Sequence, residues 1–236
     1  MSFWGYSSAS ERRSYARQMA ASLEKSGRKL EPVTIQGLKI ARSFWGKAWC
    51  EHLESFSDIF NRLERGRTYA RNGSVLHLAV TPGQIEALVS GGSLYDVRIR
   101  IDDLAPTLWQ SIQEKCAGQV ATMLELLQGQ FSSQVMKVVT DRHQGLFPQP
   151  SQIHLKCSCP DGARMCKHVA AVLYGMGNRL DDQPELLFRL RGVDPAELFS
   201  THLHLPQARD AEVLPDDGLA DLFGIELLLD PEGLSP

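Results

Sequence analysis

The stretch Cys157-Ser-Cys-Pro-Asp-Gly-Ala-Arg-Met-Cys-Lys-His168 holds three of the five cysteines and one of the seven histidines of this 236-residue chain. It begins inside a segment, residues 153–159, in which apolar and polar side chains alternate as they do along a β-strand. Side chains two residues apart in a strand point to the same face. We therefore expect Cys157 and Cys159 to project together.

The second half of this stretch predicts a turn followed by a helix. Pro160-Asp-Gly162 is a strong turn signal, and residues 169–176 have the apolar spacing of a helix. Residues two apart within a helix lie about 200° apart around its axis. Cys166 is therefore expected before the helix or at its cap, and His168 in the first turn, so that both return over the first two sulfurs.

Three thiolates and one imidazole form a donor set that suits tetrahedral zinc, and a full shell of four protein ligands is typical of structural sites. We expect one structural Zn²⁺ ion held by Cys157, Cys159, Cys166 and His168. Binding at such sites contributes on the order of 10 kcal/mol, so a small module can depend on it for folding. The alternative is a redox-active Cys-x-Cys pair next to an unrelated Cys-x-His.

The spacing C-x-C-x₆-C-x-H resembles that of the SWIM zinc finger, which occurs in bacterial Swi/Snf-type ATPases, plant Mutator-type transposases and MEK-kinase-like proteins. The preceding strand and the following Lys167-His-Val-Ala-Ala-Val-Leu173 resemble the flanks of that finger over residues 140–180. Residues 40–200 resemble stand-alone bacterial SWIM proteins, through Phe44-Trp-Gly-Lys-Ala-Trp49 and a Gly-rich meander ending near Ile101. The resemblance implies binding to DNA or to protein.

The remaining pattern predicts a mixed α+β fold. One amphipathic helix is expected from Ser43 to about Leu63 with Gly66 as its stop, its Trp45 and Trp49 forming core rather than stacking on bases. The other expected elements are an N-terminal helix (10–26), three strands of an antiparallel meander (74–80, 84–90 and 94–101), helices beginning at Pro106 and Ser132, a zinc-stapled ββα module, and helices at 184–191 and 194–200.

Four segments follow from these patterns. They are a basic N-terminal arm (1–40), an α+β domain (41–145), the zinc finger with its following helices (146–200) and an acidic C-terminal tail (201–236).

Charge is distributed unevenly, although the net charge is only −3. Residues 1–71 contain 13 Lys or Arg against 7 Asp or Glu, whereas residues 205–236 contain one Arg against 8 acids. This asymmetry suggests a basic interaction surface and an acidic tail, although an uneven solvated surface would look the same. The candidate nucleic-acid contacts are Lys156, Arg164, Lys167, Arg98, Arg100, Arg42 and Lys47.

Composition and motifs argue against a secreted protein, a membrane protein and several classes of enzyme. The N-terminus lacks the apolar segment of a signal peptide, and no run approaches the roughly 18 apolar residues of a membrane helix. We expect a cytoplasmic or nucleoid-associated protein with no membrane partner. Nucleotide-binding, serine-hydrolase and zinc-protease motifs are absent from the sequence.

The sequence therefore predicts a zinc-binding, non-enzymatic protein that contacts DNA through its basic surface. One alternative is an adaptor whose tail (205–236) docks on a Swi/Snf-type ATPase. A weaker alternative is a thiol oxidoreductase that uses Cys157 and Cys159.

Overall fold

The computed structural model of the protein describes residues 9–56, 62–120, 122–130, 132–163 and 165–200. The acidic tail and Arg164 lie outside the described residues. The elements are, in chain order, α1 (Ala9–Lys25), α2 (Phe44–Glu54), α3 (Leu63–Arg71), β1 (Val75–Thr81), β2 (Gln84–Ser90), β3 (Leu94–Ile101), α4 (Pro106–Cys116), α5 (Met123–Gln128), α6 (Ser133–Val139), η1 (Pro150–Gln152), β4 (Ile153–Cys157), α7 (Lys167–Arg179), α8 (Glu185–Arg191) and α9 (Glu197–Ser200).

The predicted antiparallel meander is confirmed, and it gains a fourth strand. The sheet has the order β1-β2-β3-β4, with β4 antiparallel to β3 so that Cys157 lies opposite Val97. Gly83 supplies the left-handed backbone conformation (φ 66°) that the β1–β2 turn requires. The strand that carries the first zinc ligand is thus hydrogen-bonded to the meander. Between residues 146 and 200 the described chain has one strand, β4, before α7, and the strand beside it is β3 of the meander.

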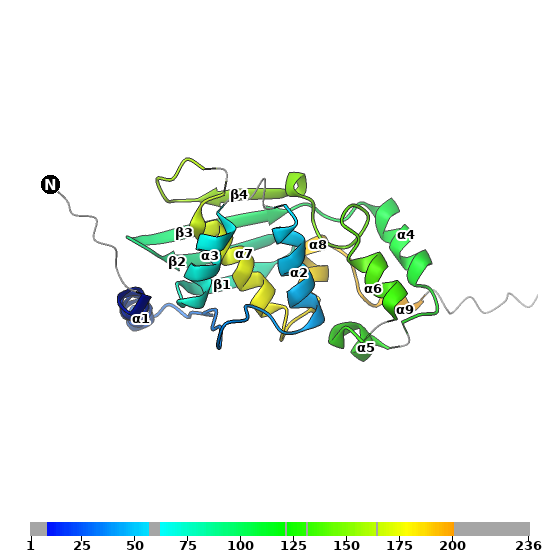
Figure 1. The fold of residues 1–236 in the computed structure, drawn as a ribbon, viewed down its shortest axis with the longest axis horizontal. Helices are drawn as coiled ribbons and strands as arrows, with labels where there is room; N and C mark the ends of the chain where they lie inside the picture. The colour runs from blue at the N-terminus through cyan, green and yellow to red at the C-terminus, as the bar shows by residue number, and fades with distance from the viewer. Residues whose placement is uncertain (1–8, 57–61, 121, 131, 164, 201–236) are drawn as a thin grey trace, which may run out of the picture. The chain divides into compact units, whose positions relative to one another are not determined.

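Three helices, α2, α3 and α7, cover one face of this sheet (Figure 1). Alternate residues of β3 are buried beneath them, while the residues between are exposed. Trp45 and Trp49 of α2 are fully buried, and their indole N–H groups donate to the carbonyl oxygens of Leu126 (2.9 Å) and Leu173 (2.8 Å). Core packing of the two tryptophans is therefore confirmed.

The single long helix expected from Ser43 is wrong. The structure ends α2 at Glu54 and begins a separate helix, α3, at Leu63. Gly66 does not stop a helix but lies inside α3, where a Cβ would stand 2.3 Å from the Cβ of Ala170 in α7. The glycine is required because α3 and α7 approach each other too closely for a side chain.

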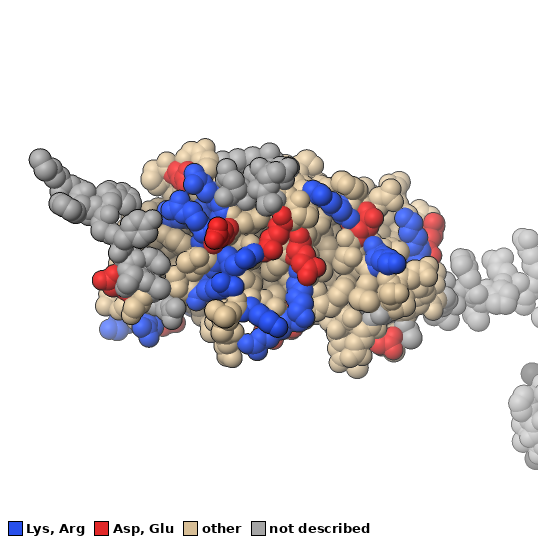
Figure 2. Space-filling model, in the orientation of Figure 1, with Lys and Arg blue, Asp and Glu red and all other residues tan. Residues whose placement is uncertain are grey.

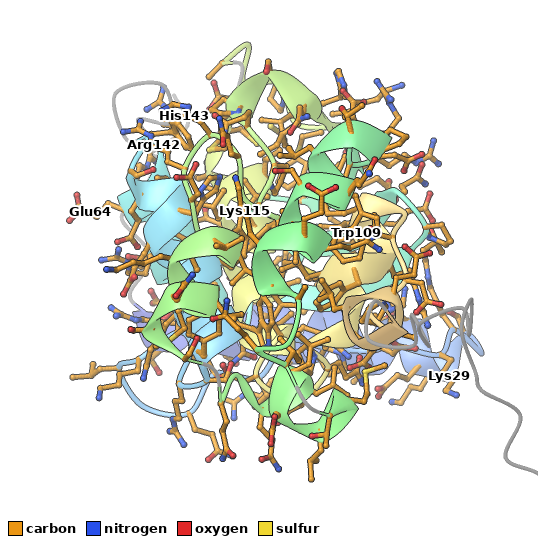
Figure 3. All side chains as sticks on the ribbon, turned by 90° about the vertical axis from the view of Figure 1, so that its right-hand side faces the viewer. Lys29, Glu64, Trp109, Lys115, Arg142 and His143 are labelled. Atoms are coloured by element: carbon orange, nitrogen blue, oxygen red, sulfur yellow. The ribbon has the colours of Figure 1, made fainter. Side chains whose placement is uncertain are left out.

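Hydrogen bonds connect the segment before α2 to the sheet, and α9 to α4. The segment before α2 borders β1, since the Leu78 amide donates to Glu31 and the Val33 amide to Val75. At the opposite end, Trp109 of α4 (labelled in Figure 3) donates its indole N–H to the carboxylate of Glu197 in α9. No helix among the described residues is both long and apolar enough to cross a membrane.

Candidate metal centre

Four side chains converge from the end of β4, the loop that follows it and the start of α7. The ligand atoms of Cys157, Cys159, Cys166 and His168 all lie within 4.8 Å of one another. The imidazole Nδ1 of His168 is 3.8 Å from the Sγ of Cys157 and 3.8 Å from the Sγ of Cys166. The predicted ligands are thus brought together, and Nδ1 is the nitrogen that faces the sulfurs.

The local structure of the predicted turn and cap explains this convergence. Cys166 is the N-cap of α7, and its Sγ accepts a hydrogen bond from the Val169 amide at 3.5 Å. His168 stands in the first turn of the same helix, as its position in the sequence predicts. In the connecting loop, the Asp161 carboxylate accepts from the Ala163 amide (3.2 Å), a local contact typical of Asp in turns.

The donor set and its spacing fit zinc. Zn–S bonds of about 2.3 Å and Zn–N bonds of about 2.0 Å place tetrahedral ligand atoms about 3.5–3.8 Å apart. The 3.8 Å separations of Nδ1 from two of the sulfurs lie within a few tenths of an ångström of the tetrahedral N···S distance of about 3.5 Å. The four side chains are therefore positioned to bind one zinc ion.

The electrostatics of the thiols also favour a cation. The hydrogen bond from the Cys157 thiol lowers the pKa of Cys166, and the same contact raises the pKa of Cys157. The two thiols thus shift each other's pKa in opposite directions, and a bound divalent ion favours the deprotonated form of all its thiol ligands. By contrast, burial raises the pKa of Cys50 to about 12 and that of Cys116 to about 11, so both favour the protonated thiol.

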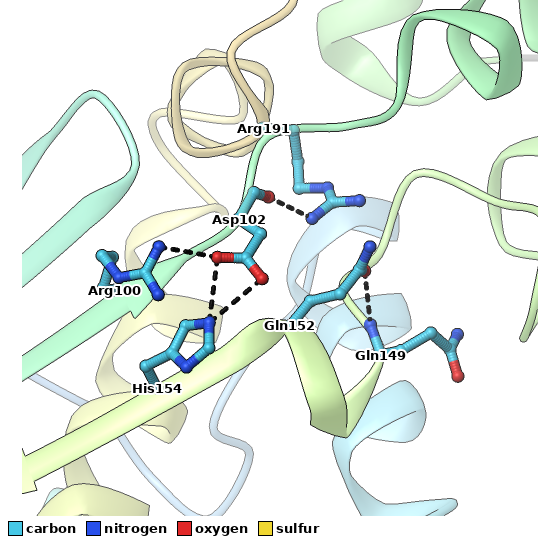
Figure 4. Close-up of polar contacts among 6 residues, drawn as sticks. All are labelled: Arg100, Asp102, Gln149, Gln152, His154 and Arg191. Carbon is cyan, nitrogen blue, oxygen red and sulfur yellow. Dashed lines mark hydrogen bonds and ion pairs between the residues drawn. The ribbon is translucent and has the colours of Figure 1, made fainter.

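Three of the predicted nucleic-acid contacts lie on the sheet face opposite α7. Arg98 and Lys156 are cross-strand neighbours there, and the Arg98 Nε stands 3.4 Å from the Glu86 carboxylate. Arg100 pairs with Asp102 at 2.7 Å (Figure 4). Acidic partners therefore offset much of the positive charge on this face.

The other predicted contacts belong to the helical layer. Arg42 and Lys47 are exposed at the start of α2, where the Arg42 guanidinium donates to the Gln36 carbonyl (3.0 Å). Lys167 lies at the N-terminus of α7 with its Nζ 5.7 Å from the centre of the Tyr69 ring. The predicted set is thus divided between two faces, and Arg164 lies outside the described residues.

Sequence reasoning missed the basic residues of α3. Arg65 and Arg71 are exposed there, and neither takes part in an ion pair within the described part of the chain. Figure 2 shows basic side chains gathered over α2 and α3, with acidic groups between them. The sequence did contain a sign of this basic helix, since residues 62–71 include four arginines in ten residues. That the helix packs against α7 is visible only in the structure.

His154, which the sequence places away from the metal, is exposed and pairs with Asp102 at 2.9 Å. The Asp102 carboxylate also accepts from Arg100, and its backbone carbonyl accepts from the buried Arg191 of α8 (Figure 4). The hydrogen bond from His154 is the main cause that lowers the pKa of Asp102. This group links β3, β4 and α8, and His154 does not belong to the metal centre.

Comparison with known proteins agrees with the geometry. Residues 145–174 match the SWIM zinc finger family. The chain is 33% identical over 164 residues to Rv2102, an uncharacterised protein of Mycobacterium tuberculosis, and the alignment covers 68% of this chain. The chain spans 59% of the length of that relative. No solved structure matches the chain.

Proposed function

We propose that this chain, which carries a SWIM zinc finger at residues 145–174, is a non-enzymatic protein that binds nucleic acid. The contact surface is formed by α3 and the first turn of α7. Zinc has a structural role in this proposal, because a closed shell of four protein ligands leaves no open position for a substrate. What zinc supplies is a fixed N-terminus for α7, against which α3 packs.

The observation that carries the proposal is that two exposed arginines, Arg65 and Arg71, form no ion pair within the described residues and lie on a helix that packs against α7. Arg65 precedes Tyr69 by four residues, so the two share one strip of α3. Lys167 stands over the Tyr69 ring from the side of α7. Arg65 and Lys167 thus flank one aromatic residue, and the exposed Thr68 lies next to it.

This surface has the chemistry expected for phosphate contacts. Lys, Arg and Thr side chains supply most protein contacts to phosphate oxygens, and these contacts are independent of sequence. Each phosphate neutralised on duplex DNA contributes about 0.9 to the slope of log affinity against log salt concentration. The proposal therefore concerns general nucleic-acid binding and assigns no base specificity.

The test is binding of fluorescent duplex DNA, single-stranded DNA and RNA across a salt series, followed by anisotropy. We expect affinity at low salt that falls as salt rises. The double variant Arg65→Gln, Lys167→Gln is expected to reduce the salt slope by about two, one unit for each lost phosphate contact.

The matched control is Arg98→Gln, Arg100→Gln, which removes two positive charges from the opposite face. These arginines already pair with Glu86 and Asp102, so this variant is expected to bind as the unmodified chain does. Absence of binding at low salt, or equal losses in both double variants, would reject the α3 surface.

A second function, a protein adaptor, is favoured by the composition of the C-terminal segment. Residues 205–236 contain 8 acids, one Arg and a leucine-rich run, Asp221-Leu-Phe-Gly-Ile-Glu-Leu-Leu-Leu229. A Swi/Snf-type ATPase is the proposed partner, with this segment as the docking element. Capture of the purified ATPase by the full chain, but not by a chain ending at residue 204, would support the adaptor; equal capture would remove this role from the segment.

The thiol oxidoreductase hypothesis is separated from both proposals by zinc content. A metal-bound thiolate set retains stoichiometric zinc through dialysis and reacts slowly with thiol reagents, whereas a redox pair needs a free, accessible thiolate. Zinc-free protein with two rapidly alkylated thiols at Cys157 and Cys159 would favour the redox role.

A further inference from the structure

The imidazole of His168 is enclosed by residues that lie outside the zinc finger. Its side chain is 3% exposed. The ring of Tyr95 in β3 stacks on it with centroids 4.2 Å apart and planes 26° apart. The ring of Tyr69 in α3 meets it edge-on at 5.5 Å and 70°. The metal ligand is therefore held between two aromatic walls supplied by the meander and by α3.

Hydrogen bonding within the described protein does not fix the orientation of this ring. Its Nδ1 faces the sulfurs, and its Nε2 is buried with no protein hydrogen-bond partner. Metal-bound histidines usually donate the second ring N–H to a carboxylate, a carbonyl or water, which fixes the ring. At His168, the packing of the Tyr95 and Tyr69 rings against the imidazole limits the orientations that it can adopt.

The turn between β2 and β3 closes the remaining side of the pocket. A Cβ added to Gly91 would stand 2.9 Å from the Nε2 of His168 and 2.8 Å from the Cε2 of Tyr95. The next residue, Gly92, has far more room, since its Cβ would meet only the Tyr95 hydroxyl at 3.7 Å. Neither glycine is among those with positive φ, so the requirement at Gly91 is space, not backbone conformation.

We infer that Gly91 and Tyr95 are positioning residues of the metal centre, which hold His168 with Nδ1 directed at the ion. Both lie more than sixty residues before Cys157 in the chain, and they reach the site because α7 packs against the strands of the sheet. Stacking should also strengthen when the metal is bound, because a coordinated imidazole is electron-poor and the face of a tyrosine ring attracts positive charge.

The decisive experiment compares Gly91→Ala with Gly92→Ala in the full chain. Zinc affinity is measured by competition with a chromophoric chelator, and folding by far-UV circular dichroism. Loss of outer residues that orient a metal ligand typically weakens affinity 10–100-fold. We expect a loss of at least about 10-fold for Gly91→Ala and no change for Gly92→Ala. Equal affinity in two folded variants would overturn the inference.

Cobalt substitution tests whether the affected ligand is the imidazole. In Gly91→Ala, the ligand-field bands of bound Co²⁺ should shift as nitrogen is lost from the coordination shell, while the thiolate charge-transfer absorption remains. In a His168→Ala background, Gly91→Ala should cause no further loss of zinc affinity, because the ligand that it displaces is already absent. A full additional loss in that background would assign Gly91 a purely structural role.

A second pair of variants decides the matter if Gly91→Ala does not fold. Tyr95→Phe keeps the ring and should bind zinc as the unmodified chain does, whereas Tyr95→Leu removes the stacking surface and should bind it more weakly. Equal zinc affinities for these two variants would contradict the proposed role of the ring.

Discussion

Two buried histidines of this protein sit in nearly the same aromatic surroundings. His168 has Tyr95 stacked on it and Tyr69 at its edge. His52 of α2 has Phe147 stacked on it (5.4 Å, 29°) and Phe56 at its edge (5.1 Å, 82°). The two imidazole rings differ in the atoms that their nitrogens face.

The Nε2 of His52 lies 3.0 Å from the Pro148 carbonyl oxygen, which gives that ring an ordinary structural contact. The Nε2 of His168 has no hydrogen-bond partner among the residues that the structure describes, and its Nδ1 faces two sulfurs. Aromatic packing therefore does not by itself make a metal ligand. A nitrogen directed at clustered thiols does, and packing then decides how well the ligand is held.

Removing zinc is expected to cause the largest loss of stability. It tests whether His168, unlike His52, contributes to folding through a metal ion. Structural zinc contributes on the order of 10 kcal/mol, which is comparable with the whole stability of a typical domain, about 5–15 kcal/mol. Chelation should therefore expose α7 and β3 to amide hydrogen exchange. Unchanged protection in metal-free protein would show that the site is dispensable for folding.

The contact between α3 and α7 is the next test, because it carries Tyr69 to His168. Gly66→Ala would place a Cβ 2.3 Å from the Cβ of Ala170, and such overpacking costs about 1–3 kcal/mol or more. Urea unfolding of the zinc-bound protein measures this loss. Gly162→Ala is the control, since nothing lies within 4 Å of its added Cβ; equal stability in both variants would contradict the close approach.

Replacing His52 should cost less, because no metal is lost. His52→Gln keeps an amide N–H that can donate to the Pro148 carbonyl but loses the ring contacts with Phe147 and Phe56. Aromatic pairs contribute about 0.5–1.5 kcal/mol each, so the variant is expected to destabilise the protein by about 1–3 kcal/mol, with zinc stoichiometry unchanged. Urea unfolding and metal analysis measure the two quantities. A loss of zinc from this variant would break the distinction between the two histidines.

His52 also predicts a pH dependence. Burial is the main cause that lowers its pKa from 6.5, so the unfolded state binds more protons than the folded state between the lowered value and 6.5. Stability rises with pH where the unfolded state binds more protons. The free energy of unfolding should therefore fall as pH decreases below about 6.5. His52→Gln should make this fall with pH less steep. An unchanged pH dependence in the variant would mean that other groups cause it.

The smallest effect is expected at the exposed histidine, His154. Asp102→Asn removes its ionic partner and that of Arg100, and exposed pairs contribute about 0.2–1 kcal/mol. The pKa of Asp102 is lowered from 3.8 in the folded protein. The ionised carboxylate therefore contributes to the free energy of unfolding above about pH 3.8, and this contribution is lost as the pH falls through the lowered pKa. Unfolding at pH 7 and pH 3 checks this, and a loss of several kcal/mol at pH 7 would show that the network is more than a surface contact.

Much of the metal centre could be predicted from the sequence because its determinants are local. The alternation before Cys157, the Pro160-Asp-Gly162 turn and the apolar spacing after His168 lie within about twenty residues. Strand and helix periods then fix which side chains share a face. The same reasoning failed between Ser43 and Gly66, where a continuous apolar spacing concealed two helices.

The sequence by itself determined the four ligands, the place of Cys166 before the helix or at its cap, and the meander of three strands, because each follows from the spacing of neighbouring side chains. Only the tertiary structure decided that β4 joins β3, that Gly91 and Tyr95 border His168, and that α3 carries its arginines to the side of α7. These contacts join segments far apart along the chain. They depend on strand register and helix packing, which one-dimensional periodicity does not encode.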